Sequence, residues 1–274
     1  MDEYIRCKGK LFKQCKQGII NQDDSYAMKV LEGHTCEVEF YGLSQNADIY
    51  AADIRTYQEK NVLGIQFHAN GKLDMPVLLP IPGVFNVYNA LTAIALCRHL
   101  LVPIDKIAEA LNHVYVKGRM EIVKVPDPYL LMIDYAHNAL SLKSLLTTLR
   151  EYEPKRIVCM FGCGGNRSKL RRYEMGEISA NMADLTVITS DNPRYEEPMD
   201  IISDIQIGVE KGKGRSVMIP DRKQAIRYCM EYAMEGDFVI LAGKGHEDYQ
   251  EIKGVKYPMD ERVIIKSILA EKRN

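Results

Sequence analysis

The stretch DFVILAGKGHE, residues 237–247, joins a short apolar run to a loop of glycine and charged residues. An uninterrupted apolar run that ends at glycine is typical of a strand buried on both faces of a sheet. Similar segments precede it: YLLMIDYAHN (129–138), KRIVCMFGCGGNR (155–167) and DLTVITSDNPR (184–194). Each predicts a buried strand that runs directly into a polar or glycine-rich loop.

Helical patterns separate these strands. Apolar residues at helical spacing predict helices at 139–152, 173–183, 199–212, 221–234 and 260–273, with Asp221 as an N-cap and Gly212 closing the third. A short strand at 216–220 and a hairpin at 250–258 around Gly254 complete this half. The alternation predicts an α/β fold, a Rossmann-like, mostly parallel sheet with helices on both faces.

The loops of such a sheet predict where a ligand binds. In open α/β sheets the ligand lies outside the carboxyl ends of the strands. The segments DYAHN, GCGGNR, SDNPR and AGKGHE all follow a predicted strand. They are therefore expected to form one candidate site on a single rim of the sheet.

The first half of the chain has a different pattern. It predicts a helix at 1–15, a strand and turn at 18–24, and strands of an antiparallel or mixed sheet at 36–42, 48–58 and 61–69. Within 78–100 a helix is expected after Pro82-Gly83, and another is expected at 104–114. Gly118 interrupts the pattern in YVKGRME, so the predicted domains are 1–117 and 118–274.

Composition excludes several classes of protein. Of 274 residues 46% are hydrophobic and 27% charged, and the net charge is −1. Nothing in that balance favours nucleic acid or an anionic membrane as a partner, and no apolar run approaches the ~20 residues of a membrane span. The seven cysteines form no CxxC pair, so we expect buried thiols, a cytoplasmic protein and no zinc site.

Six motifs carry a resemblance to a known family. GVFNVYNALTAIA (83–95), GRMEIV (118–123), DYAHN (134–138), FGCGGNR (161–167), SDNPR (190–194) and AGKGHEDYQ (242–250) occur in this order. Together they resemble the Mur ligases of peptidoglycan synthesis, and among them the MurE type. The resemblance implies an ATP-dependent, Mg²⁺-assisted amide ligase that adds a third amino acid to UDP-MurNAc-L-Ala-D-Glu.

One motif of that family does not occur in the sequence. Mur ligases have a UDP-substrate domain, a central ATPase domain and an amino-acid-binding domain, but no G-x-x-x-x-G-K-[ST] phosphate loop is found here. Residues 1–117 are accordingly interpreted as the C-terminal part of the central domain, and 118–274 as the amino-acid-binding domain. The chain alone is expected to be inactive and to self-associate through the incomplete central domain.

The resemblance assigns one residue of the first half to Mg²⁺ and two to the nucleotide. Lys8 falls where the family carries a carbamylated lysine, a carboxylate-like group that helps hold Mg²⁺. Asn86 and Asn89 resemble a pair that contacts adenine. The alternative for Lys8 is an exposed helix lysine, and for the two asparagines a polar cluster at the start of a helix.

Three more residues are implied on the nucleotide side. Arg119 and Asp134 resemble residues that contact the nucleotide phosphate and ribose. His137 lies in the same loop as Asp134, with a structural histidine as the alternative.

The amino-acid site is implied by the last three motifs. In the family, D-N-P-R marks enzymes that add meso-diaminopimelate, and a guanidinium at Arg194 suits the distal carboxylate of that amino acid. The alternative is a surface arginine paired with Glu196 or Glu197. The resemblance further implies Arg167 as a second carboxylate ligand and Glu247 as the partner of the distal ammonium. Asp191 and Asn192 are expected to shape the turn, and Gly243 to let the backbone approach the substrate closely.

The sequence departs from the family pattern at two places. The family's DYAHTPD is DYAHNAL here, and Tyr173 stands at a proline position after Arg171 and Arg172, which keep the positive charge.

Two other functions stay open as alternatives to the MurE-type ligase. A non-catalytic amino-acid-binding or scaffold protein derived from a ligase is one alternative. A folylpolyglutamate- or cyanophycin-type ligase is the other.

Overall fold

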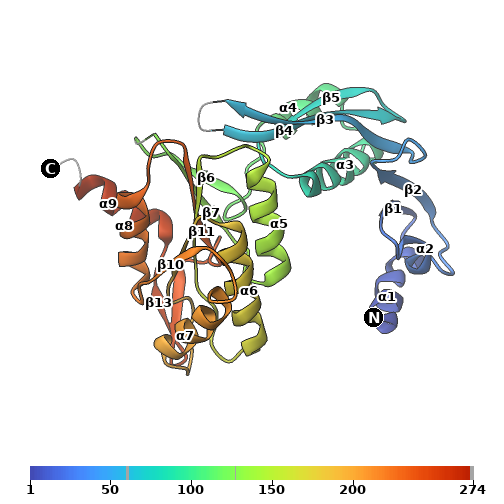
Figure 1. The fold of residues 1–274 in the computed structure, drawn as a ribbon. Helices are drawn as coiled ribbons and strands as arrows, with labels where there is room; N and C mark the ends of the chain where they lie inside the picture. Colours follow the sequence, from blue (N-terminus) through green and yellow to red (C-terminus); the bar gives the residue numbers. More distant parts are fainter. Residues whose placement is uncertain (60–61, 127, 272–274) are drawn as a thin grey trace. The chain divides into compact units, whose positions relative to one another are not determined.

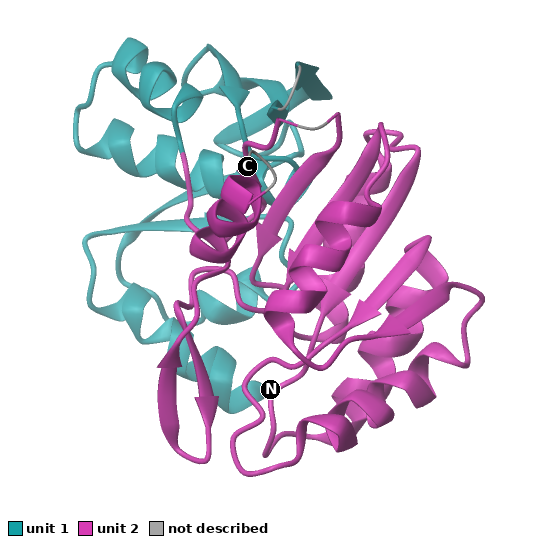
Figure 2. Ribbon diagram, turned by 90° about the vertical axis from the view of Figure 1, so that its left-hand side faces the viewer, with its two compact units in different colours: residues 1–114 teal, residues 115–274 magenta. Residues whose placement is uncertain are grey.

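The computed structural model describes residues 1–59, 62–126 and 128–271. These residues divide into two compact units, Met1–Val114 and Tyr115–Asn274, which Figure 2 colours separately. Within the described ranges, no helix combines the length and the apolar character that crossing a membrane requires. Parts of two predicted elements lie outside the described ranges. These are residue 61 of the strand predicted at 61–69 and residues 272–273 of the last predicted helix. Residues 60, 127 and 274 also lie outside these ranges.

A six-stranded sheet forms the centre of the second unit. Its strands lie in the order β10-β9-β8-β11-β7-β6, and every neighbouring pair is parallel except β6 with β7. The bounds are β6 Glu121–Val123, β7 Leu130–Asp134, β8 Arg156–Phe161, β9 Leu185–Ile188, β10 Arg215–Met218 and β11 Asp237–Ala242. The predicted mostly parallel sheet is therefore confirmed.

Helices cover both faces of this sheet (Figure 1). They are α5 Ala139–Arg150, α6 Lys169–Met182, α7 Pro198–Val209, α8 Arg222–Tyr232 and α9 Glu261–Glu271. Helices α8 and α9 share one core with the sheet, in which Ile226 and Ile265 pack against Leu131, Val239 and Leu241. Helices α5, α6 and α7 lie on the opposite face. A hairpin of β12 Tyr249–Ile252 and β13 Val255–Pro258 follows β11, as predicted.

Several predicted boundaries are wrong in detail. Helix α6 begins at Lys169, four residues before the predicted start. Helix α7 ends at Val209, and Gly212 follows a tight turn in which its N–H bonds the carbonyl of Val209 at 2.9 Å. Asp221 is the predicted N-cap, and its carboxylate accepts from the N–H of Gln224.

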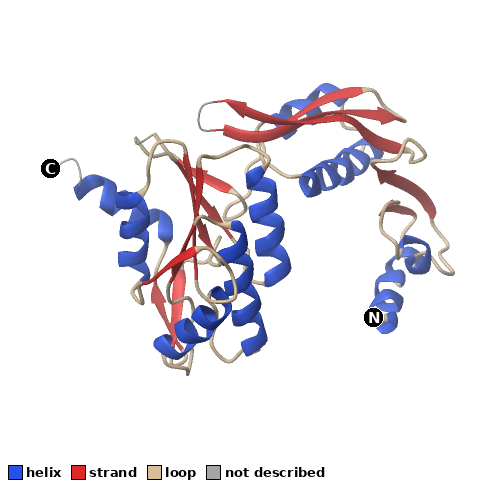
Figure 3. Cartoon of the chain, in the orientation of Figure 1, coloured by secondary structure: helices blue, strands red, loops and turns tan. Residues whose placement is uncertain are grey.

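The first unit is built on a mixed five-stranded sheet in the order β1-β2-β3-β4-β5, drawn as red arrows in Figure 3. Its strands are β1 Gln17–Asn21, β2 Glu37–Gly42, β3 Ile49–Glu59, β4 Val62–Gly71 and β5 Met75–Leu79. Its α-helices among the described residues are α1 Asp2–Gly9, α2 Ala27–Val30, α3 Val84–His99 and α4 Ile104–Asn112. The sequence did not predict α2 or β5.

The predicted helix at 1–15 is also too long. It ends at Gly9, and a 3₁₀ turn at Leu11–Lys13 follows. A Cβ at Gly9 would lie 2.6 Å from the carbonyl oxygen of Val30. The close approach of α2 therefore requires glycine at this point.

A fully buried ion pair ties the carboxyl ends of two strands together. The guanidinium of Arg222, at the start of α8, bonds Glu261 at 3.0 Å, the carbonyl of Ser190 at 3.2 Å and the carbonyl of Ala242 at 2.9 Å. Ser190 lies just after β9, and Ala242 is the last residue of β11. One side chain thus fixes the two points from which two of the predicted site loops begin.

Replacing Arg222 should destabilise the second unit strongly. Arg222→Ala leaves the carboxylate of Glu261 and two carbonyls buried without their partner, and we expect a loss of roughly 3–5 kcal/mol in the free energy of unfolding. The measurement is urea unfolding followed by circular dichroism. Arg227→Ala, on the same helix, is the control, because Arg227 pairs with Glu271 at an exposed position. Equal effects of the two changes would contradict this role of the buried pair.

Candidate functional site

A cavity of about 260 Å³ lies at the carboxyl ends of β7, β8, β9 and β11. Strands β8 and β11 are neighbours, and the helices that follow them lie on opposite faces of the sheet. This is the arrangement that opens a crevice in an α/β sheet. Its lining comes from all four predicted loops: Tyr135, His137, Gly162, Cys163, Gly164, Arg167, Arg171, Asp191, Asn192, Arg194, Gly243 and Glu247.

Arg194 is half-buried and lines the cavity. Its Nε donates to Glu251 at 3.2 Å, and its Nη1 donates to the carbonyl of Gly165 at 2.7 Å. The alternative of a surface arginine paired with Glu196 or Glu197 is wrong, since Glu196 instead pairs with Arg172. The φ of Arg194 is 53°, in the left-handed region, which indicates that tertiary contacts hold its backbone.

Lys244 is a central residue that the sequence did not single out. Its side chain is fully buried, and Nζ donates to Asn192 Oδ1 at 2.7 Å, Glu247 Oε2 at 3.1 Å and the carbonyl of Tyr249 at 2.6 Å. A buried ammonium needs such partners, because its desolvation is otherwise uncompensated. The signal available in the sequence was a lysine between two glycines, directly after a buried strand.

Glu247 is held as a carboxylate. Burial alone disfavours its charge, but the hydrogen bond from Asn192 Nδ2 at 2.9 Å and the charge of Lys244 together lower its pKa below the ordinary value. Glu247 lines the cavity, and its lowered pKa keeps it anionic at neutral pH. It is therefore able to accept from an ammonium group of a ligand.

Asp191 and Gly243 bring two loops into close contact. Asp191 Oδ1 accepts from the N–H of Asn192, at 2.6 Å, which fixes the turn. Gly243 has a φ of 106°, and a Cβ there would lie 3.0 Å from Asp191 Oδ2. A side chain at this position would be strained and would press on the turn, so the position requires glycine.

Of the three arginines in the loop after β8 and in α6, two line the cavity and one is buried in the scaffold. Arg167 is exposed and Arg171 half-buried, and both line the cavity. Arg172 is fully buried, where Nη1 bonds Asp204 at 2.9 Å and Nη2 bonds Glu196 at 2.8 Å. The expectation that Arg172 contributes positive charge to this loop is thus corrected, since two carboxylates neutralise it.

The charges around the cavity suit a small zwitterion. Arg167, Arg171 and Arg194 supply guanidinium groups for carboxylates, and Glu247 supplies a carboxylate for an ammonium. Bidentate guanidinium contacts fix the orientation of a carboxylate as well as binding it. The geometry thus favours a ligand that carries both kinds of charged group.

The residues of this unit that the sequence predicts on the nucleotide side lie around Tyr135. The guanidinium of Arg119 lies 4.8 Å from the ring centroid of Tyr135, and the ring of His137 lies 4.7 Å from it. Asp134 is buried, and its two carboxylate oxygens accept from the N–H groups of Met120 and Ala136. Burial raises the pKa of Asp134 although these bonds oppose the shift. Its carboxylate thus already joins two backbone segments.

Lys8, Asn86 and Asn89 belong to the first unit. Lys8 is exposed on α1, with Nζ 5.4 Å from the ring centroid of Tyr4. At the start of α3, Asn86 Nδ2 donates to the carbonyl of Pro82 and Asn89 Nδ2 donates to Asn86 Oδ1. Within the described ranges, no group of three or more histidine, cysteine or acidic side chains is placed to hold a metal ion.

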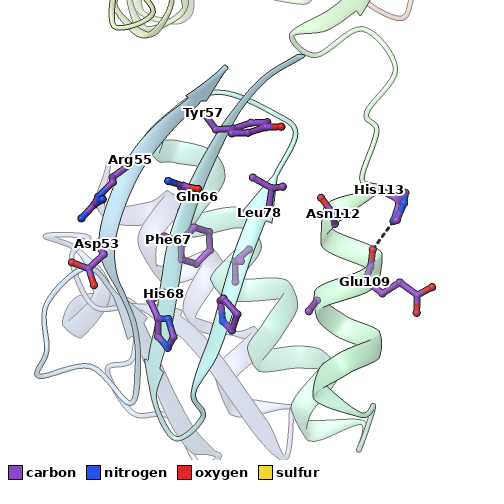
Figure 4. Close-up of a pocket in the computed structure, with 13 residues that line it drawn as sticks. Asp53, Arg55, Tyr57, Gln66, Phe67, His68, Leu78, Glu109, Asn112 and His113 are labelled. Atoms are coloured by element: carbon purple, nitrogen blue, oxygen red, sulfur yellow. Dashed lines mark hydrogen bonds between the residues drawn. The ribbon is translucent and has the colours of Figure 1, made fainter. Parts of the chain in front are cut away.

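A larger cavity, of about 640 Å³, also lies within the first unit (Figure 4). It is a groove between the exposed face of the β3-β4-β5 sheet and α4, and its lining includes Arg55, Tyr57, Gln66, His68 and Asn112. None of the residues that the sequence singled out lines it. The smaller cavity is the candidate site, because convergent and mutually bonded charged groups surround it.

Comparison with known families gives two matches along the chain. The family described as "Mur ligase middle domain" matches residues 1–97, and the family described as "Mur ligase, glutamate ligase domain" matches residues 118–245. The second match contains most of the cavity-lining loops.

Individual proteins are similar over nearly the whole chain. A UDP-N-acetylmuramoyl-L-alanyl-D-glutamate–2,6-diaminopimelate ligase of Caldanaerobacter subterraneus subsp. tengcongensis is 42% identical over 99% of this chain and 56% of its own length. A solved structure of a ligase of that name is 32% identical, with a TM-score of 0.68, over 99% of this chain and 57% of that chain. This chain thus spans about half the length of the relatives that it matches.

A folylpolyglutamate synthase from Thermotoga maritima has a similar fold. The two chains share 16% identity with a TM-score of 0.66, over 88% of this chain and 56% of that chain. At that identity the likeness concerns the fold alone.

Replacing Lys244 should destabilise the second unit in a pH-dependent way. Lys244→Met leaves Glu247 and Asn192 without the buried ammonium, at a cost of roughly 3–5 kcal/mol near neutral pH. In the wild type, the lowered pKa of Glu247 adds stability at pH values above the pKa that Glu247 has in the unfolded chain. This added stability is lost as the pH falls through the pKa of Glu247 in the folded chain. In the variant, burial dominates and raises that pKa, so the loss should be larger at about pH 7 than at about pH 4.

The measurement is urea unfolding at both pH values. Lys256→Met is a matched control, because Lys256 is exposed on β13 with Nζ 4.1 Å from the ring centroid of Tyr249. A loss for Lys244→Met that is the same at both pH values would argue against the coupling to Glu247.

Proposed function

This chain belongs to the Mur ligase family, and on that premise we propose that it supplies the amino-acid-binding part of a MurE-type ligase. The ligase joins meso-diaminopimelate to UDP-MurNAc-L-Ala-D-Glu in peptidoglycan synthesis. In this proposal residues 1–117 are part of the central ATPase domain and residues 118–274 form the amino-acid-binding domain. The names of the similar ligases support the substrate pair.

The observation that carries the proposal is the shared cavity of Arg167, Arg194 and Glu247. Meso-diaminopimelate is lysine with a second carboxylate beside its distal ammonium. Arg194 is proposed to bind the distal carboxylate, with Arg167 as a second carboxylate ligand and Glu247 as the partner of the distal ammonium. L-lysine would leave the half-buried guanidinium of Arg194 without a carboxylate, which is how a polar site rejects an analogue that lacks the matching group.

In the proposed reaction these residues position an amine rather than transfer protons. The neutral amine of diaminopimelate attacks the side-chain carboxyl carbon of D-glutamate after ATP has converted that carboxylate to an acyl phosphate, and phosphate leaves as the amide forms. Holding the amino acid at its far end limits the directions in which the amine points. ATP and Mg²⁺ supply activation of that carboxylate, and family membership alone supports both. The described residues offer no metal-holding cluster, so no step is assigned to them through Mg²⁺.

Lys8 stays proposed as a carbamylated lysine that helps hold Mg²⁺. The residues that stay proposed as nucleotide-binding are Asn86, Asn89, Arg119, Asp134 and His137. Asp134 already accepts one backbone N–H at each carboxylate oxygen. A cytoplasmic location is also proposed, because the proposed reaction depends on ATP. All seven cysteines lie within the described ranges and are free thiols, which suits a reducing compartment. Self-association also stays a prediction.

Ligand selectivity tests the proposal. In calorimetric titrations the chain is expected to bind meso-diaminopimelate more tightly than L-lysine, and Arg194→Ala should weaken meso-diaminopimelate binding by roughly 1–3 kcal/mol, or about 5- to 150-fold. L-lysine binding should change little. Arg215→Ala, an exposed arginine on β10, is the control. Equal wild-type affinity for both amino acids would contradict the assignment of Arg194.

A further inference from the structure

Strand β12 holds the loop 191–194 along its whole length. Gln250 Nε2 donates to the carbonyl of Asp191 at 2.6 Å, and the N–H of Glu251 donates to Asn192 Oδ1 at 2.9 Å. The N–H of Arg194 donates to the carbonyl of Glu251 at 3.0 Å, and the N–H of Lys253 donates to the carbonyl of Arg194 at 2.7 Å. The left-handed backbone of Arg194 is therefore fixed by strand-like pairing with β12.

The same strand also fixes the Arg194 side chain. Two of the five guanidinium N–H donors are used, by Glu251 at Nε and by the carbonyl of Gly165 at Nη1. A Cβ at Gly164 would lie 2.8 Å from Nη1, so the guanidinium lies where glycine leaves room for it. Among the described residues none bonds Nη2, which stays available together with the second N–H of Nη1.

We infer that Glu251 is a positioning residue that sets the selectivity of this site for a ligand with a distal carboxylate. By holding Nε, it turns the Nη1–Nη2 edge of Arg194 toward the cavity, where a carboxylate is able to bind it with two parallel hydrogen bonds. The inference rests on the proposed function, because it explains how the proposed selectivity residue is oriented. Glu251 itself is absent from the cavity lining.

The physical need for such a residue follows from the arginine side chain. A free arginine samples many rotamers, and each hydrogen bond to a ligand then costs ordering entropy. The Arg194 and Glu251 side chains are each 24% exposed, so their pair is shielded in part from water. Removing Glu251 leaves the backbone bonds of β12 in place and frees only the Nε of Arg194, since Nη1 keeps its bond to the carbonyl of Gly165, so the fold should persist.

Titration of Glu251 variants of this chain tests the inference. Glu251→Ala should lower the ratio of meso-diaminopimelate to L-lysine affinity by about tenfold, whereas Glu251→Gln, whose amide oxygen still accepts from Nε, should lower it much less. Glu235→Gln removes an exposed carboxylate in the same unit and is the control. A purely structural role would weaken both ligands alike, and an unchanged ratio in Glu251→Ala would overturn the inference while leaving the proposed function intact.

A ligand-free measurement separates the two ideas. The Nε–H resonance of Arg194, assigned by its loss in Arg194→Lys, should exchange slowly with water in the wild type and fast in Glu251→Ala. Slow exchange in a wild type that does not bind meso-diaminopimelate selectively would contradict the proposed function, but it would still support the contact between Glu251 and Arg194. Fast exchange in the wild type, or slow exchange that survives in Glu251→Ala, would overturn the inference.

Discussion

The ammonium of Lys244, buried at the end of β11, is the constraint on which the site depends. A cation without solvent must be surrounded by acceptors, and here the acceptors come from the loop after β9, from the loop after β11 and from the start of β12. Asn192 uses one oxygen to accept from both Lys244 and the backbone of Glu251. The charge requirement of one side chain thus brings three segments to the same point.

The surrounding scaffold makes that convergence possible. Arg222 and Glu261 hold the carboxyl ends of β9 and β11, while Arg172 connects α6 to the segment after the Asp-Asn-Pro-Arg turn. Both arginines are buried and paired, so they organise the loops without facing a ligand. The arginines that line the cavity, Arg167, Arg171 and Arg194, are the more exposed ones. Burial therefore separates the structural cations from those available to a carboxylate.

The glycine-rich loop after β8 shows why a motif alone is ambiguous. Such a loop suits phosphate binding by backbone N–H groups, but here a Cβ at Gly165 would lie 1.9 Å from the carbonyl oxygen of Pro193. The glycine is required because the loop after β8 packs directly on the loop after β9. The carbonyl of Gly165 then accepts from Arg194, so the packing of the two loops also helps to orient the Arg194 side chain.

The sequence by itself determined the parallel sheet, its strands and the rim on which the site lies. Uninterrupted apolar runs and helical periodicity are local properties, and the carboxyl ends of parallel strands necessarily share one edge. Most of the cavity-lining residues were also predictable, because they lie in loops of glycine and charged residues that directly follow buried apolar strands.

Only the tertiary structure decided what each charge does. Arg172 and Lys244 look like other basic loop residues in the sequence, yet both are fully buried and bound to carboxylates. Arg194 pairs with Glu251, fifty-seven residues away, rather than with its neighbours Glu196 and Glu197. Partners at such separations are set by how the loops fold onto one another, and the energy of a charge depends on its burial, which no local pattern records.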